Sequence, residues 1–135
     1  MMKTISPSFL VLSLLAVSIG CGGPQRPAGE TLSELATAIR TPVMDAQQSD
    51  DNSRFVERLV EDGTLQGMRR FEVEEAIGRG EPCSRHARCA EQGFAGNDLF
   101  YMVGASGTFS GALPQLIIGF GREGRVNSVW NLRTH

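Results

Sequence analysis

The chain has 135 residues, of which 41% are hydrophobic and 21% are charged, and its formal net charge is −2. These values are ordinary for one small globular domain. Nucleic-acid-binding proteins need a basic patch or stripe, which a slightly acidic chain does not favour, so we expect no nucleic-acid partner.

Residues 1–20 are predicted to be a lipoprotein signal peptide. Lys3 precedes an apolar run of 11 residues, Phe9 to Ile19, which is too short to span a bilayer but has the length of a signal-peptide core. The run ends in "SIGC", which resembles the lipobox of bacterial lipoproteins. This resemblance implies cleavage before Cys21 and attachment of a lipid to its thiol. A plain secretory peptide cleaved nearby is the alternative, and it would leave Cys21 as a free thiol.

The cysteine count supports lipidation of Cys21. The chain has three cysteines, so lipidation of one leaves an even number, Cys83 and Cys89, in an oxidising compartment. Gly22 stands after Cys21 in place of aspartate, and by the same resemblance this favours sorting to the outer membrane. Residues 21–30 are rich in glycine and proline and are expected to form a lipidated tether. We therefore expect a periplasm-facing outer-membrane protein, held to the membrane by its lipid.

Residues 31–52 are predicted to form a helix followed by a polar linker. Residues 31–40 place apolar side chains on one helical face, with Thr31 and Glu34 in a capping-box pattern. Pro42 is expected to stop this helix. The polar residues that follow are expected to form a loop, so the helix lies between two irregular segments.

The compact domain is expected to span residues 53–135. It begins with a helix that Asn52 or Ser53 caps and Gly63 ends. A second short helix, with valine, alanine and isoleucine on one face, is expected to end at Gly78.

The last third of the chain is predicted to be a sheet. Residues 99–104 and 115–120 are aromatic, β-branched or continuously apolar, and residues 125–134 alternate in polarity. A glycine-rich connection, 106–114, and a "GREG" turn, 121–124, separate these strands. Helices followed by strands predict an α+β fold, in which two helices pack on one face of a three-stranded antiparallel sheet.

Several stretches resemble the SmpA/OmlA, or BamE-like, family of outer-membrane lipoproteins. They are "LQGMRRFEVEEAIGRGEPC" at 65–83, "FY" at 100–101 and "IIGFGREGRVNSV" at 117–129. The residues that match the family signature are Gly67, Met68, Val73, Ile77, Gly78 and Pro82. The resemblance implies the same two-layer fold and a non-enzymatic accessory role in outer-membrane β-barrel assembly. Other members of the fold bind different proteins, as in secreted inhibitors of β-lactamase, and the cysteine segment at 83–89 is not part of the signature.

The segment "CSRHARC" holds the pattern Cys83-x-x-His86-x-x-Cys89. In an oxidising compartment we expect Cys83 and Cys89 to form a disulfide, with His86 exposed at the tip of a small loop. Closing this short loop stabilises the fold by about 2 kcal/mol in the loop-entropy estimate. Two alternatives stay open, namely free thiols and a metal site that uses Cys83, His86 and Cys89. A structural zinc site usually has four ligands, and this group offers three.

Catalytic chemistry is not predicted. Ser106 and Ser110 lie in a glycine-rich stretch without the Gly-x-Ser-x-Gly pattern of a nucleophile elbow. The same stretch has no lysine, so it is not a phosphate-binding loop of the Walker type. We expect no enzyme activity, no cofactor and no bound metal.

A protein-binding surface is the remaining expectation. Aromatic residues and arginine are favoured at protein interfaces, and an open sheet face or edge is a plausible docking site. The candidate binding residues are Arg69, Arg70, Phe100, Tyr101 and Arg133. The sequence therefore predicts a non-enzymatic envelope lipoprotein that binds another envelope protein, in barrel assembly or envelope integrity. The alternatives are a small metal-binding domain and an inhibitor or sensor domain on the same fold.

Overall fold

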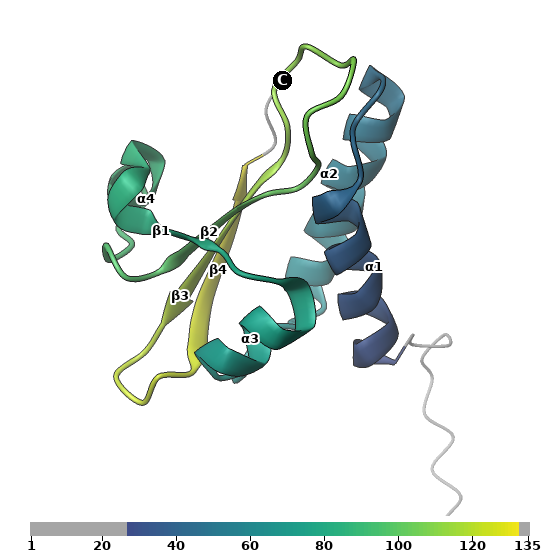
Figure 1. The fold of residues 1–135 in the computed structure, drawn as a ribbon. Helices are drawn as coiled ribbons and strands as arrows, with labels where there is room; N and C mark the ends of the chain where they lie inside the picture. Colours follow the sequence, from purple (N-terminus) through teal and green to yellow (C-terminus); the bar gives the residue numbers. More distant parts are fainter. Residues whose placement is uncertain (1–26, 133–135) are drawn as a thin grey trace, which may run out of the picture.

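The computed structural model describes residues 27–132 (Figure 1). The predicted signal peptide, the lipid-attachment residue Cys21, most of the tether and the candidate binding residue Arg133 lie outside the described residues.

The first helix, α1 (Ala28–Arg40), begins earlier than the sequence pattern indicates. Thr31 is an interior residue whose hydroxyl donates to the carbonyl oxygen of Pro27 at 3.5 Å, so the predicted capping box at Thr31 is wrong. The predicted end is confirmed, because the helix stops two residues before Pro42. Leu35 and Ala36 are buried in the main core, so α1 is an integral part of the fold.

The second helix, α2 (Ala46–Glu61), includes much of the segment that was expected to be a loop. Asp45 caps it, since its carboxylate accepts a hydrogen bond from the Gln48 N–H at 2.8 Å. The prediction failed because the buried positions in the first half of α2 carry small polar residues, Ser49 and Ser53, which hide the helical period of the core. The expected boundary between linker and domain at residue 53 therefore falls inside a helix.

Four short elements follow in the middle of the chain. The helix α3 (Arg70–Ile77) ends at Gly78, as predicted, and the positive φ of 94° there is one that glycine adopts without strain. The two-residue strand β1 (Glu81–Pro82) comes next. It is followed by a single 3₁₀ turn, η1 (Cys83–Arg85), and the short helix α4 (Ala87–Glu91).

The sheet has four strands, so the fold class α+β is confirmed but the expected number of strands is wrong. The strands β2 (Leu99–Met102), β3 (Gln115–Phe120) and β4 (Val126–Leu132) are those that the sequence predicts; β3 has the predicted bounds, and β2 and β4 are shorter than predicted. Neighbouring strands are antiparallel in the order β1-β2-β3-β4. The sequence missed β1 because it is only two residues long and includes a proline.

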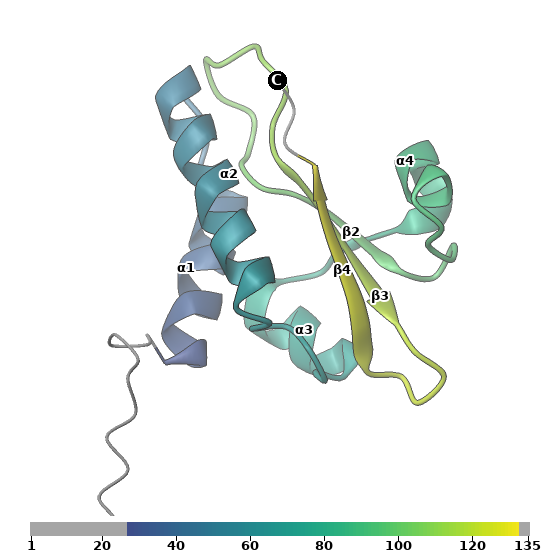
Figure 2. The ribbon, with the colours of Figure 1, turned by 180° about the vertical axis from the view of Figure 1, so that it is seen from behind.

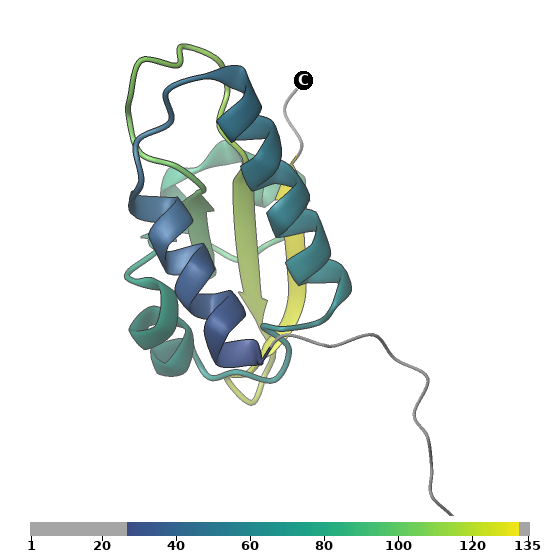
Figure 3. The same ribbon diagram turned by 90° about the vertical axis from the view of Figure 1, so that its right-hand side faces the viewer.

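Three helices cover one face of the sheet, where the sequence predicted two, and α4 lies on the other face (Figures 1 and 2). Seen from the side of the helices, α1 lies nearer to β2, and α2 lies nearer to β4 (Figure 3). Alternate strand residues point into the main core beneath α1, α2 and α3. The buried members of this core are Leu35, Ala36, Val56, Leu59, Leu65, Val73, Ile77, Leu99, Tyr101, Val103, Leu116, Ile118 and Val126.

The glycine-rich connection between β2 and β3 packs against the connection between α1 and α2. The backbone of Val43 accepts from Phe109 N–H and donates to Ala105 C=O, each at 3.1 Å. Gly107 is needed for this approach, because a Cβ atom there would lie 2.2 Å from the carbonyl oxygen of Val43. These contacts join the α1–α2 pair to the sheet at the end opposite α3.

Candidate functional site

The second face of the sheet carries its own small apolar cluster, covered by residues 83–94, which we call the stapled segment. Cys83 and Cys89 form a disulfide with a Cα–Cα distance of 5.5 Å, as predicted. Both cysteines are buried against Phe100 of β2 and Ile117 of β3. The disulfide therefore does more than close a loop, because its sulfur atoms belong to a core that faces away from α1, α2 and α3.

His86 lies between the two cysteines and is not the exposed loop tip that the sequence predicts. Its ring stacks on Phe100, with the centroids 3.8 Å apart and the planes inclined by 15°. Its Nε2 atom lies 2.5 Å from a carboxylate oxygen of Glu81 in β1. The side chain is only 26% exposed. The prediction failed because sequence spacing does not show that the loop folds back over β2.

Phe94 ends the stapled segment above β3 and β4. A Cβ atom at Gly119 would lie 2.8 Å from the Phe94 ring, so glycine in β3 leaves the space that the ring occupies. The buried carboxylate of Asp98 holds the following turn, since it accepts from Ala95 N–H at 2.8 Å and from Phe120 N–H at 3.1 Å. The stapled segment is thus attached to the sheet by apolar packing and by hydrogen bonds at both of its ends.

The same face is open beyond the stapled segment, and we call this part the open end; it comprises Met102 and Gln115, with Trp130 at its border. Strand alternation and the register place these three on the same side as Phe100 and Ile117. Met102 is 40% exposed, and Trp130 is partly buried at the margin of the cluster. The side-chain oxygen of Gln115 is buried and has no hydrogen-bond partner among residues 27–132. The sequence pattern did not single out Met102 and Gln115, although alternation with Phe100 is a usable signal for Met102.

The aromatic members of the predicted binding set do not form a surface. Phe100 is buried beneath His86 on the second face, whereas Tyr101 is buried in the main core on the opposite face. The Tyr101 hydroxyl donates to Gly78 C=O at 2.8 Å. Burial raises the pKa of Tyr101 above its ordinary value; the carboxylate of Glu74 raises it further, and Arg70 opposes the shift.

The arginines of the predicted set lie elsewhere. Arg70 at the start of α3 donates to the backbone carbonyl of Asn97, and its guanidinium lies 4.6 Å from the ring centroid of Phe120. Arg69 is exposed and forms an isolated antiparallel bridge with Arg125. The structure therefore does not bring the predicted binding residues together, and the open end replaces them as the candidate site.

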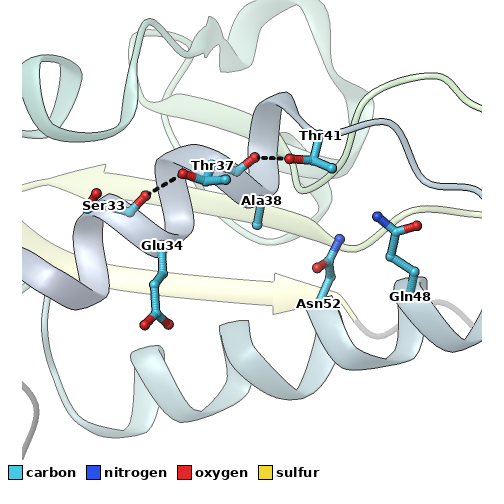
Figure 4. A pocket seen from close by; sticks show the side chains of 7 residues that line it. All are labelled: Ser33, Glu34, Thr37, Ala38, Thr41, Gln48 and Asn52. Atoms are coloured by element: carbon cyan, nitrogen blue, oxygen red, sulfur yellow. Dashed lines mark hydrogen bonds between the residues drawn. The ribbon is translucent and has the colours of Figure 1, made fainter.

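A groove of about 320 Å³ runs between α1 and α2 (Figure 4). The hydroxyls of Thr37 and Thr41 donate to carbonyl oxygens one turn earlier in α1. Gln48 donates to the carbonyl oxygen of Pro42 at 3.1 Å. The threonine hydroxyls are therefore used within α1 and its end, and Gln48 ties α2 to the connection that precedes it. The residues that line the groove are Ser33, Glu34, Thr37, Ala38, Thr41, Gln48 and Asn52.

The described residues also bear on a metal site and on a membrane span. Between residues 27 and 132, no three or more His, Cys, Asp and Glu side chains gather in a way that would hold a metal ion. The sulfur atoms of Cys83 and Cys89 are bonded to each other, so they are not thiolate ligands in this form. In the same part of the chain, no helix is long and apolar enough to cross a membrane.

Comparisons of this chain with protein-family models, with curated proteins and with solved structures find no match.

Proposed function

We propose that this chain is a non-enzymatic, lipid-anchored envelope protein whose folded domain docks another envelope protein through the open end of the second sheet face. The observation that carries this proposal is the division of that face. The stapled segment covers Phe100 and Ile117, whereas Met102 remains 40% exposed at the other end. Trp130 lies between the covered and open parts.

The residues of the open end favour a protein as the partner. Tryptophan and methionine are enriched at protein interfaces, where a rigid aromatic ring and an adaptable thioether side chain fill pockets of the partner.

The compartment is supported by two independent features. The disulfide between Cys83 and Cys89 is typical of an oxidising compartment. The N-terminal residues resemble a lipoprotein signal peptide that ends before Cys21. A role in β-barrel assembly remains a prediction from the resemblance to the SmpA/OmlA family.

Site-specific photo-crosslinking in intact envelopes tests the docking site. We expect a photoreactive amino acid at Met102 to give an adduct with a defined envelope protein. The matched control carries it at Gln47, which is exposed on the outer side of α2. Adducts of equal yield at both positions, or no adduct at Met102, would overturn the proposal.

The anchor is tested separately by Cys21→Ala. Loss of the lipid attachment site should move the protein from the membrane fraction to the soluble fraction, because a cleaved chain without its lipid has lost its acyl anchor. Retention of the Cys21→Ala protein in the membrane fraction would contradict the anchor and leave the docking site to be judged by crosslinking.

A further inference from the structure

The two edges of the sheet differ in their protection against pairing with another strand. At one edge, β1 has only two residues, the charged Glu81 and Pro82, which has no N–H to donate. Short length, charge and proline are devices that prevent edge-to-edge pairing. At the other edge, β4 has seven residues, "VNSVWNL", without a charged residue or a proline. Only the β4 edge is therefore long and chemically unprotected.

The first residue of β4 is already occupied on its outer side. Val126 donates to the carbonyl oxygen of Met68 at 2.8 Å and accepts from Gly67 N–H at 2.9 Å. The chain between α2 and α3 therefore covers the start of the strand. In Figure 2, where β4 is the nearest strand, α2 lies beside its remaining length and not over its outer edge. Free backbone groups are thus expected only in the second half of β4.

The alternation of hydrogen bonds across the sheet shows which backbone N–H and C=O groups of β4 point outward. Val103 N–H donates to Pro114 C=O at 2.8 Å, so alternation turns the backbone groups of Ile117 away from β2 and toward β4. The register pairs Ile117 with Trp130, whose backbone groups therefore point inward. Its neighbours Val129 and Asn131 consequently direct their N–H and C=O groups out of the sheet. Within the described chain, β4 has β3 as its sole strand partner.

The side chains on either side of this edge differ in chemistry. Trp130 lies on the second face, beside the open end. On the opposite face, α2 turns Gln48 and Asn52 toward α1, so its other flank lies on the β4 side. By helical spacing that flank carries Asp50, Glu57 and Glu61 together with one arginine, Arg54, so its charge is net negative. An added strand would therefore place one row of side chains beside tryptophan and the alternate row beside carboxylates.

Resting on the proposed docking function, we infer that β4 accepts an extended segment of the partner as a fifth strand, hydrogen-bonded to Val129 and Asn131. The segment alternates apolar side chains, which lie beside Trp130, with basic side chains, which lie beneath α2. Two outward residues are enough to hold a short peptide, whereas a stable dimer usually buries about 1,600 Å² of surface. The occupant is therefore a segment of a different protein and not a second copy of this chain.

A peptide of about eight residues that alternates valine and arginine is the direct probe, added to the full chain extracted from envelopes. Amide hydrogen exchange, resolved by residue, should slow about tenfold at Val129 and Asn131, while Trp130, which is already paired with β3, changes little. A matched peptide of valine and glutamate should give no protection. Equal protection by both peptides, or none at Val129 and Asn131, would overturn the inference. So would a peptide-free dimer in which these two amides are already protected.

Two variants test the backbone and the charge in turn. Asn131→Pro removes the outward N–H and should abolish protection by the valine–arginine peptide, whereas Asn131→Ala keeps that N–H and should retain it. If Asn131→Pro does not fold, Asn131→Lys serves in its place, since its charge repels the basic peptide and should favour the acidic one. Protection of Val129 by the valine–arginine peptide in Asn131→Pro, or in Asn131→Lys, would contradict the inference.

The two proposals can fail separately. A Met102 adduct that persists in Asn131→Pro and Asn131→Lys leaves the docking function standing and removes strand addition. Absence of a Met102 adduct in the unmodified chain removes the docking function itself.

Discussion

The imidazole of His86 stacks on the ring of Phe100 with 3.8 Å between the ring centroids. This contact joins the middle of the stapled segment to the second face of the sheet. Phe100 is thereby covered, although it belongs to the same row of side chains as the exposed Met102. The stack thus marks where the protected part of that face ends.

Replacing His86 tests how much this contact stabilises the segment. His86→Ala should lower the free energy of unfolding by about 1 kcal/mol, the usual worth of an aromatic pair. His86→Phe keeps a stacked ring without the contact to Glu81 and should retain most of the stability. Arg85→Ala, an exposed neighbour in the same segment, is the control for chemical denaturation. Equal losses for His86→Ala and Arg85→Ala would contradict a stabilising stack.

Removing the disulfide should loosen the cover of the second face. The double change Cys83→Ala and Cys89→Ala should cost about 2 kcal/mol of unfolding free energy from loop entropy. Fluorescence reports the change, because Trp130 is the one tryptophan in the chain and lies against this cluster. Cys21→Ala keeps the disulfide and is the control. An unchanged unfolding midpoint after the double change would show that the disulfide contributes nothing to stability.

Tyr101 should make stability fall in alkaline solution. Burial raises its folded-state pKa above the ordinary value of 10.0, so the folded state holds the phenolic proton more tightly than the unfolded chain. This contribution is complete below pH 10 and is lost as the pH rises above it toward the folded-state pKa. Tyr101→Phe should flatten the alkaline decline. Phenolate absorbance measures the titration directly, since the chain has a single tyrosine; ionisation near pH 10 in the folded protein would contradict the burial effect.

Gly107 should be intolerant of any side chain. A Cβ atom there would lie 2.2 Å from the Val43 carbonyl oxygen, so Gly107→Ala must separate the β2–β3 connection from the α1–α2 connection. We expect a loss of about 1–3 kcal/mol, typical of overpacking. Gly29→Ala is the matched control, because its Cβ would meet no atom within 4 Å and alanine favours a helix. Chemical denaturation of both variants checks the difference, and equal midpoints would refute it.

The helices and strands whose apolar residues recur with a clear period could be predicted from the sequence. The stop before Pro42, the ends at Gly63 and Gly78 and the three longer strands follow from turn chemistry and side-chain spacing. The first half of α2 could not, because Ser49 and Ser53 occupy its buried positions. Tertiary packing tolerates small hydroxyl side chains at such positions, and a hydrophobic period then disappears from the sequence.

By itself, the sequence determined the α+β class and the three longer strands, because local periodicity needs no knowledge of distant contacts, and the cysteine count favoured the pairing of Cys83 with Cys89. Only the tertiary structure decided where that pair lies. The same alternation in β2 sends Tyr101 to the main core and Phe100 to the second face, and spacing alone does not say what covers either side. The cover on Phe100 comes from His86, 14 positions earlier, and the second half of β4 has no strand on its outer side among residues 27–132 because of strand order. Both are long-range relations, which chain folding sets and local sequence does not encode.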